Sequence, residues 1–367
     1  DRLKKNTIFL NPADKYVILQ NGRFILEDYQ ETQPLHFSID HFLCSAAIEK
    51  GEHAIAVILS GTGTDGTIGI NSIKANGGLV IAQSTEQAKY DGMPQSAINS
   101  GLVDFILDAE KMIDEILLYV THPIIMLDEK KTDDEELQIN YSQLFSIIRA
   151  KTGNDFSNYK LTTIKRRIAR RMMASKIVKV RDYLRFLKND ATESFKLSKE
   201  FLITVTSFFR DTESFAVLEN IIIPTLIKNT KGKDTKIRIW VPGCATGEEA
   251  YSIAMLMFEV FQNQSIEPNF QIFATDLDSE SIQFARQGLY AETISNKLSA
   301  NRLKRFFTSE GSYYKIKKEL RETVIFAEHN LIKDPPFSKL DMICCRNVMI
   351  YLDQHLQKKI IRLFHLD

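Results

Sequence analysis

Apolar positions between residues 237 and 258 follow two successive patterns. The stretch opens with Ile237 to Val241, a run rich in β-forming residues and too short for a helix, which predicts a buried strand. The run breaks at Pro242-Gly243, and apolar residues then recur at helical spacing from Tyr251 to Phe258. Strand, glycine-rich turn and helix form the first unit of a nucleotide-type α/β fold, where ligands lie beyond the carboxyl ends of the strands.

The turn of this unit lacks the features of a phosphate site. Glu248 and Glu249 occupy the first helical turn, where they would repel a pyrophosphate. Neither the GxGxxG nor the GK[ST] pattern is present. A cationic ligand without phosphate fits better, and S-adenosylmethionine, with its ammonium and sulfonium, meets that requirement. The alternative is that the two glutamates only cap the helix.

Further strands with polar ends follow this unit. Residues 270–275 predict a second strand that ends in Asp276-Leu277-Asp278, the place where such folds hold ribose hydroxyls. Ser279 to Ser281 predict the start of a helix over residues 282–290. The remaining predicted strands are 324–326, leading to Asn330-Leu331, and 340–351, which the chain leaves at Arg346-Asn347.

The N-terminal part shows a second strand-helix-strand pattern. Its predicted elements are a hairpin over 7–28 with a turn at Asn21-Gly22, a helix over 37–50, a strand over 54–59, a helix over 67–75 and a strand over 78–83. Asp65 lies in the glycine-rich loop after the strand 54–59, where functional residues of α/β sheets gather. A turn or helix-capping aspartate is the alternative, and the residues alone favour it.

The middle of the chain is helical and locally basic. Residues 127–140 are acidic and predict a linker or a solvated helix start, and helical periodicity runs from Tyr141 to about Leu226. Between 161 and 188 only Asp182 opposes the basic residues, which are Lys165, Arg166, Arg167, Arg170, Arg171, Lys176, Lys179, Arg181, Arg185 and Lys188. This predicts a positive face, and the lack of interleaved aromatics from Lys165 to Val180 argues against nucleic acid.

Composition adds limits to this picture. A chain of 367 residues is expected to hold more than one domain, and its 47 basic and 47 acidic residues give no global attraction to nucleic acid or membrane. Four scattered cysteines indicate a reduced, cytoplasmic protein, and no apolar run approaches the roughly 18 residues of a membrane span. His329 has no metal partner at ligand spacing, so we expect no metal site. Because the chain starts without Met inside an element, we expect a fragment of a longer protein.

Several motifs together resemble one family. GCATGEEAYSIAM, ATDLD, Asn330-Leu331 and CRNVMIYLD, preceded by TVTSFFR at 204–210, resemble in their order the chemotaxis receptor methyltransferases, the CheR family. The resemblance covers residues 141 to the end. It implies an all-helical domain, then a Rossmann-like class I methyltransferase core with a small inserted β-subdomain at about 291–323. The implied reaction is methyl transfer from S-adenosylmethionine to receptor glutamates.

A second resemblance covers roughly residues 7–120. SGTGTDGTIGINSIKANGG and Asp91-Gly92-Met93-Pro94 resemble the chemotaxis receptor methylesterases, the CheB family, an α/β, partly doubly wound domain with a Ser-His-Asp triad. Asp65 matches the triad aspartate. The serine and histidine lie upstream in the family, and the histidines present here, His36, His41 and His53, do not match. The resemblance therefore implies an incomplete esterase, inactive in this piece.

The first resemblance also implies cofactor contacts. Glu248 would bind the ammonium of the methionine part, and Asp276 the ribose hydroxyls, with Asp278 as the competing candidate. Thr204, Thr206 and Arg210 would close over the cofactor, with Arg210 on its carboxylate; Thr204 stands where some family members have Asn. Asn330-Leu331 and Asn347-Val348 would line the adenine and methionine sides.

These resemblances imply an order of domains. They are the methylesterase part (1–125), an acidic linker (126–140), the helical domain (141–232) and the S-adenosylmethionine-binding domain (233–367), whose C-terminal end is expected to be missing. The implied partner is the cytoplasmic helical region of chemotaxis receptors, with no nucleic acid and no membrane insertion; kinase or sensor domains could be linked outside this chain. Two other functions stay open: an inactive signalling scaffold, and a methyltransferase acting on nucleic acid or a small molecule. The second would be favoured by an NPPY-type motif, which the sequence lacks.

Overall fold

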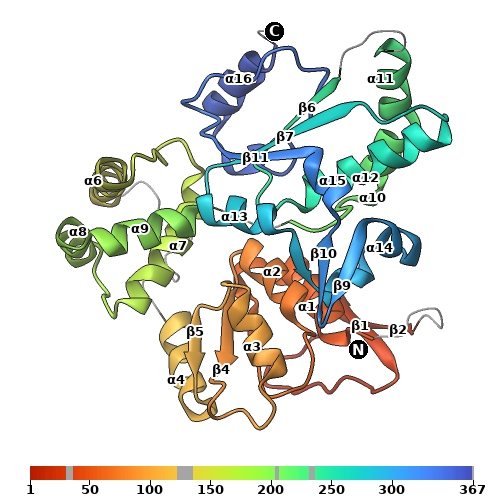
Figure 1. Cartoon of the computed structure of the whole chain (residues 1–367). Helices are drawn as coiled ribbons and strands as arrows, with labels where there is room; N and C mark the ends of the chain where they lie inside the picture. The colour runs from red at the N-terminus through yellow and green to blue at the C-terminus, as the bar shows by residue number, and fades with distance from the viewer. Residues whose placement is uncertain (30–35, 122–134, 203–205, 231–235, 366–367) are drawn as a thin grey trace. The chain divides into compact units, whose positions relative to one another are not determined.

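The chain forms two compact units. The computed structural model describes residues 1–29, 36–121, 135–202, 206–230 and 236–365. One unit holds Asp1–Ser157 and Leu161–Phe201, and the other holds Asn158–Lys160 and Leu202–Asp367 (Figure 1). Within these described residues, the helices are all too short or too polar to cross a membrane.

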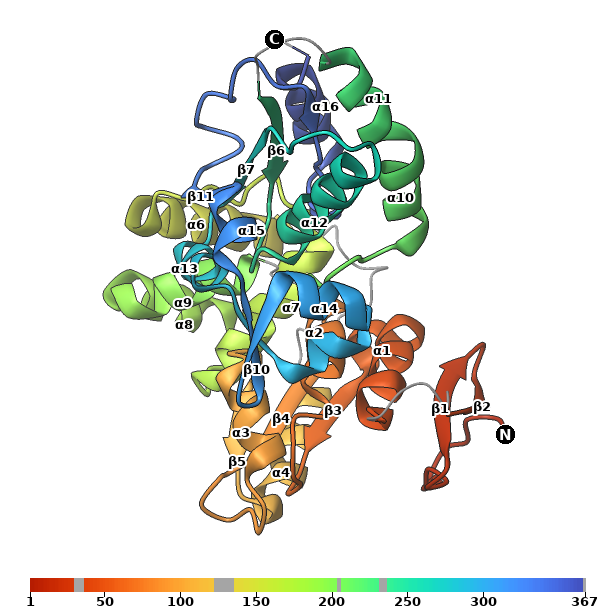
Figure 2. The same cartoon turned by 45° about the vertical axis from the view of Figure 1, so that its right-hand side comes forward.

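The first unit begins with the predicted hairpin. Strands β1 (Lys15–Gln20) and β2 (Arg23–Asp28) pair in antiparallel register around Asn21 and Gly22. Both turn residues have positive φ, +51° and +67°, as a two-residue hairpin turn requires. The amides of both residues donate to Glu49 of helix α1 (Ser38–Lys50), so the hairpin is tied to that helix. Figure 2 shows the hairpin on the side of the unit where α1 lies.

A parallel sheet follows in the order β3 (Ile55–Ile58), β4 (Leu79–Gln83), β5 (Phe105–Leu107). All five residues of β4 are buried, which explains the continuous apolar run from Leu79 to Ala82 before the buried Gln83. The helices of this part are α2 (Thr67–Ala75), α3 (Gly92–Asn99) and α4 (Ala109–Val120), with a 3-10 turn at Gly51–His53. The predicted strand-helix-strand pattern is confirmed.

Four helices complete the first unit. They are α6 (Glu135–Thr152), α7 (Leu161–Ala174), α8 (Val180–Asn189) and α9 (Ala191–Phe201). Helix α6 begins at Glu135, inside the stretch 127–140 that was predicted as a linker or a helix start. From Glu135 on, this stretch is helical. Residues 127–134 lie outside the described part of the chain. Leu144, Ile148 and Leu197 are fully buried among these helices.

The second unit is built on a parallel sheet in which the order of strand addition reverses. Its strands are β6 (Ile237–Pro242), β7 (Phe270–Asp276), β11 (Val324–Glu328) and β12 (Met342–Ile343), in the order β11-β7-β6-β12. From β6 the chain adds β7 and β11 on one side and then β12 on the other. The strand order therefore reverses between β6 and β12, the place where open α/β sheets bind ligands.

Helix α12 (Glu248–Asn263) is buried more completely than its periodicity predicts. Every residue from Ala250 to Phe258 is buried, including Ser252, where an amphipathic helix would expose one face. Contacts with β7, β11, α11 (Ile223–Thr230) and α15 (Lys318–Glu322) surround it. The helical periodicity of the sequence could not show this burial, because it identifies only the apolar face that packs on the sheet.

Further elements surround this sheet. The other helices and turns are α10 (Thr212–Val217), a π-helical turn (Leu218–Ile222), α13 (Ser279–Gln287), a 3-10 turn (Glu292–Asn296), α14 (Ala300–Phe306), a 3-10 turn (Met349–Tyr351) and α16 (Gln354–Leu363). A small antiparallel sheet has the order β8 (Leu289–Ala291), β10 (Tyr313–Ile316), β9 (Phe307–Glu310).

The last strand is shorter than predicted. The sequence predicts a strand within residues 340–351 that the chain leaves at Arg346-Asn347. Strand β12 itself spans Met342–Ile343, and it is flanked by backbone bonds from Asp341 N to Arg238 O and from Cys344 N to Trp240 O, both at 2.8 Å. Asn347 then adopts φ +57° and turns the chain into the 3-10 turn at Met349–Tyr351, near the predicted exit.

Candidate functional site

The backbone of the turn after β6 forms hydrogen bonds with residues of two other strands, β7 and β8. Cys244 N donates to Thr275 O at 2.9 Å, and the Tyr290 hydroxyl donates to Thr246 O at 2.7 Å. Gly247, with φ +95°, immediately precedes α12. A Cβ there would lie 2.9 Å from Ala285 Cβ, so only glycine fits without movement of a neighbour. The conformation of the turn is thus tightly constrained. It lies where the strand order reverses between β6 and β12, which we call the switch point of the sheet.

Glu248 lies in this turn as a half-buried carboxylate with little access to solvent. Its Oε2 accepts the Thr246 hydroxyl at 2.7 Å. Burial raises the pKa of Glu248 to about 7, and the Thr246 hydroxyl opposes that rise. A carboxylate this poorly solvated is stabilised by a cationic ligand group, which is the chemistry the sequence predicts for it.

Asp276 ends β7 on the same edge of the sheet. Its Oδ2 accepts Ala245 N at 2.8 Å and its Oδ1 accepts Asp278 N at 2.9 Å. Burial raises its pKa, although these backbone amides oppose the shift. Asp278, the competing candidate, caps α13 instead: it accepts Glu280 N at 3.2 Å and the Ser281 hydroxyl at 2.6 Å. The geometry therefore favours Asp276 as the ligand-binding carboxylate.

Asn347 and Val348 line the other side of the switch point, after β12. Among the described residues, the buried Oδ1 of Asn347 has no hydrogen-bond partner. An unpaired buried acceptor is costly, so it marks a place for a donor from a ligand. Val348 packs against the turn at Gly243, where a Cβ would lie 2.2 Å from Val348 Cγ2.

Replacing Gly243 by Ala should destabilise the chain by about 2–4 kcal/mol, because the clash with Val348 adds to the strain of an alanine at φ +70°. Gly311→Ala is the matched control, since Gly311 has φ +62° but open space around its Cβ position. We expect the control to cost only about 1 kcal/mol in urea unfolding. Equal losses for the two variants would show that the close approach to Val348 does not constrain the turn.

Asn330 and Leu331 follow β11. The Asn330 side chain accepts Ile332 N at 3.0 Å and Lys333 N at 3.2 Å, while Asn330 N donates to Asp334 at 2.7 Å. Asn330 thus shapes a local turn with its side chain. Leu331 packs against a small apolar cluster around Leu352.

The segment before α10 reaches the start of α12. Phe209 N donates to the Ser252 hydroxyl at 3.0 Å, and this hydroxyl donates to Glu248 O at 2.7 Å. Phe208 is buried against Tyr290 and Phe307, a core position as expected. Thr206 and Arg210 are half-buried in this segment. Thr204 lies outside the described residues.

Arg346 is a residue at the switch point for which no role was predicted from the sequence. Its guanidinium donates to Glu249 at 3.2 Å, to Asp211 at 2.9 Å and to the Arg210 carbonyl at 2.8 Å. Burial raises the pKa of Glu249, while Arg346, Cys344 and Arg210 act to lower it. Arg346 therefore ties the Arg210 segment to α12, and Glu248 and Glu249 have different partners. A charged residue at the carboxyl end of a buried strand is the signal that could have identified it.

These residues fit S-adenosylmethionine. The switch point offers a poorly solvated carboxylate for an ammonium, a second carboxylate at a strand end for ribose, and an unpartnered buried amide oxygen. Two glutamates in the first turn of α12 disfavour a phosphate. No metal-ligating cluster of His, Cys, Asp or Glu is found among the described residues.

The candidate triad aspartate lies in the first unit. Asp65 Oδ2 accepts Ile39 N at 3.0 Å, and Oδ1 accepts Asp40 N at 2.9 Å, so this carboxylate caps the start of α1. His36 stacks on Tyr29, and His41 pairs with Glu27 at 2.9 Å. Asp65 thus acts as a helix-capping residue, the interpretation that the residues alone favour, although the helix it caps is the earlier α1. Its role in a catalytic triad stays a prediction.

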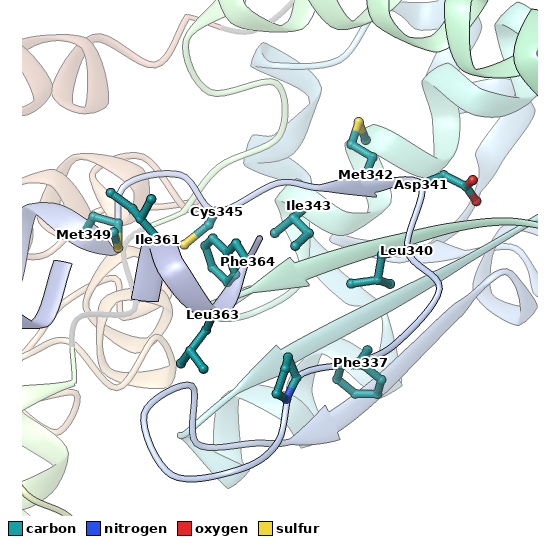
Figure 3. A pocket seen from close by; sticks show the side chains of 11 residues that line it. Phe337, Leu340, Asp341, Met342, Ile343, Cys345, Met349, Ile361, Leu363 and Phe364 are labelled. Carbon is teal, nitrogen blue, oxygen red and sulfur yellow. The ribbon is translucent and has the colours of Figure 1, made fainter. Parts of the chain in front are cut away.

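A cavity of about 490 Å³ lies beside β12 and α16 (Figure 3). Its lining is mostly apolar, including Phe337, Met342 and Phe364, with Asp341 as a charged member. Cys345 and Met349 of its wall flank Asn347-Val348, but none of the predicted cofactor residues lines it. Apart from Asp341, the cavity has no carboxylate and no side-chain amide in its lining, so the predicted cofactor site stays at the switch point.

Comparisons with known proteins agree with this geometry. Residues 204–367 match the CheR methyltransferase SAM-binding domain, 139–202 the CheR all-alpha domain and 1–116 the CheB methylesterase. A chemotaxis protein methyltransferase of Listeria innocua is 31% identical over 59% of this chain and 80% of that protein. An uncharacterized 104.1 kDa protein in the hypE 3′ region of Rhodobacter capsulatus is 38% identical over 99% of this chain. The chain spans 40% of that relative's length.

A solved structure also matches the N-terminal part. The methylesterase catalytic domain of Thermotoga maritima CheB is 36% identical, covering 29% of this chain and 58% of that one, with a TM-score of 0.27. The sheet order and the switch-point residues define an S-adenosylmethionine-binding, Rossmann-like α/β core. The chain belongs to the CheR family of chemotaxis protein methyltransferases and carries a CheB methylesterase segment ahead of it. The predicted fold class and cofactor are confirmed; the domain boundaries and individual site roles stay predictions.

Proposed function

We propose that this chain methylates glutamate side chains of chemotaxis receptors in the cytoplasm, with S-adenosylmethionine as the methyl donor. The observation that carries the proposal is a pair of poorly solvated carboxylates, Glu248 and the strand-end Asp276, which bond to the same turn at a switch point unsuited to phosphate. The family membership supports the same reaction. The scaffold alternative would leave this pair of carboxylates, whose burial is costly, without a ligand to stabilise it.

Each site residue receives a role in this proposal. Glu248 binds the ammonium and Asp276 the ribose hydroxyls. Arg210 and Thr206 close over the cofactor, with Arg210 on its carboxylate. The pairs Asn330-Leu331 and Asn347-Val348 line the adenine and methionine sides, and the free Oδ1 of Asn347 supports a donor there. Thr204 takes its role from the resemblance alone.

The chemistry needs positioning more than proton transfer. The cofactor supplies a methyl group on a sulfonium; an oxygen of the substrate carboxylate forms the new bond to that carbon as the carbon–sulfur bond breaks, leaving its electron pair on sulfur. A glutamate is already ionised at pH 7, so no general base is required. The chain's task is to hold the two reactants in line and to exclude water that would stabilise both charges.

The acidic partner would meet exposed cations on the helical domain. The sequence predicts one positive face over 161–188, but the structure corrects this, because Arg167 and Arg170 are buried and Arg171 pairs with Glu193 at 3.0 Å. The exposed cations lie further along, at Lys176, Lys179, Arg181, Arg185 and Lys188. Charge steering of a glutamate-rich receptor region onto these residues supports the proposed substrate.

The esterase segment is proposed to be inactive in this piece. Both carboxylate oxygens of Asp65 accept amides of α1, and in the family that this segment resembles the serine and histidine partners lie upstream of the matching region. In a longer native chain Asp65 would orient that histidine. We expect this chain to release no methanol from methylated receptor fragments, whereas release at a rate that Asp65→Ala abolishes would overturn the inactive assignment.

Calorimetric titration with S-adenosylhomocysteine tests the transferase proposal. We expect micromolar binding by the chain, followed by transfer of labelled methyl groups to receptor fragments. Transfer should produce base-labile label on glutamate, as a methyl ester requires. A folded chain that binds the ligand but labels no receptor fragment would favour the scaffold function. Absence of binding would contradict the cofactor site itself.

A further inference from the structure

Four charged side chains form a closed ring inside the first unit. Two come from the CheB-like segment, Lys74 of α2 and Asp104 before β5, and two from the helical domain, Arg170 of α7 and Glu200 of α9. Charges alternate around the ring. Arg170 lies 3.5 Å from Asp104 and 3.9 Å from Glu200, Lys74 lies 3.5 Å from Glu200, and Lys74 also pairs with Asp104.

The ring is largely withdrawn from water. The exposed fractions of the side chains are 13% for Lys74, 6% for Asp104, 2% for Arg170 and 19% for Glu200. Burial alone would raise the pKa of Glu200, but the cations Lys74, Arg170, Arg167 and Arg171 outweigh it and lower the pKa. Two of the four pairs join the CheB-like segment to the helical domain. Loss of any member would leave an opposite charge buried without its partner.

Backbone and apolar contacts surround the ring. Arg170 donates to Gly78 O at 3.3 Å, at the entrance to β4, and Asp104 accepts Val80 N of β4 at 2.9 Å. One turn further along α7, Met173 packs with Leu79 and Tyr119 of the CheB-like segment in one buried apolar cluster. The contact therefore combines a desolvated, charge-balanced centre with apolar packing, as specific interfaces do.

We propose that the inward face of α7 is a docking surface for the CheB-like segment of the same chain, with the four-charge ring as its specific centre. The two parts then fold as one body. Arg170 is committed to Asp104 and is out of reach of any acidic partner, which must use the exposed cations of residues 176–188. The proposal does not depend on methyl transfer, so it can fail or hold separately from the proposed function.

Hydrogen exchange of the full chain, followed by mass spectrometry, tests this docking surface. Arg170→Met removes the central cation from α7, and Asp104→Asn removes its anion while keeping an acceptor for Val80 N. We expect Arg170→Met to accelerate exchange in β4, which belongs to the other part, by about a hundredfold or more, as loss of one partner of a buried pair implies. Asp104→Asn should likewise accelerate hydrogen exchange in α7 by about a hundredfold or more.

Arg185→Met is the matched control, because its pair with Asp182 is exposed, at 69% and 52%. It should change exchange by less than about fivefold. Acceleration confined to the part that carries the substitution, or no greater than in the control, would overturn the proposal. If Arg170→Met does not fold, Lys74→Met serves instead: accelerated exchange in α9 supports the docking surface, and unchanged exchange there refutes it.

Discussion

Glu248→Gln should weaken binding of S-adenosylhomocysteine by about ten- to a hundredfold near pH 8. The substitution keeps the shape of the side chain and its capacity to accept the Thr246 hydroxyl. It removes the negative charge that we propose faces the ligand's ammonium. A hydrogen bond to a charged partner contributes about 1.5–3 kcal/mol, which corresponds to this range of affinities. Calorimetric titration of the two proteins measures the difference directly.

The same carboxyl should give the wild-type protein a pH-dependent affinity. Its pKa is raised by burial to about 7, so the ionised form that binds an ammonium is lost as the pH falls below that value. Affinity should drop about tenfold per pH unit below pH 7. Glu248→Gln should remove this dependence.

The stability of the ligand-free chain should show the opposite trend. A raised carboxyl pKa contributes stability that is fully present below its unfolded value near 4.5 and is lost as the pH rises through about 7. Ligand binding compensates for that loss by supplying a cation to the ionised carboxylate.

Glu259→Gln is the control for both measurements, since Glu259 lies on the same helix but pairs with Arg302 at 2.7 Å, away from the turn. This variant should keep the wild-type affinity and pH profile. Wild-type affinity and an unchanged profile in Glu248→Gln would remove Glu248 from the cofactor site. It would also leave the cost of burying its charge without a functional explanation.

The sequence predicted the parts of the site that local pattern determines. The strand Ile237 to Val241, the break at Pro242-Gly243 and the helix after it each have a signal within a few residues, and the structure has β6, the turn and α12 there. Asp276 was predicted for the same reason, because the end of a buried strand fixes where its next side chain lies. Local signals of this kind can be read from the sequence without knowledge of the tertiary contacts.

Pairings between distant residues were not predictable in this way. The basic run from Lys165 to Lys188 reads as one solvated face, yet Arg170 is buried against Asp104, 66 residues away. Arg346 lies 97 residues from Glu249. A charge pattern reports which side chains share a helix, but the partner that decides between solvent and burial comes from elsewhere in the chain. These pairings therefore required the structure.

Arg346→Met should destabilise the second unit by about 3 kcal/mol and weaken S-adenosylhomocysteine binding as well. The substitution leaves Glu249, whose side chain is 13% exposed, without its cation, and breaking a buried pair on one side has this cost. It also frees Asp211 and the Arg210 carbonyl, so the segment proposed to close over the cofactor loses its anchor. Urea unfolding measures the first effect and calorimetry the second.

A double variant separates the anchoring role from the charge. Arg346→Met with Glu249→Gln removes both members of the buried pair. Asp211 also loses its cation, but its side chain is 55% exposed and stays solvated, so much of the lost stability should return. Binding should stay weak, because the Arg210 segment is still not anchored. Lys318→Met, in an exposed pair with Glu322, should alter neither quantity. If the double variant recovers affinity together with stability, Arg346 only neutralises Glu249 and does not position Arg210.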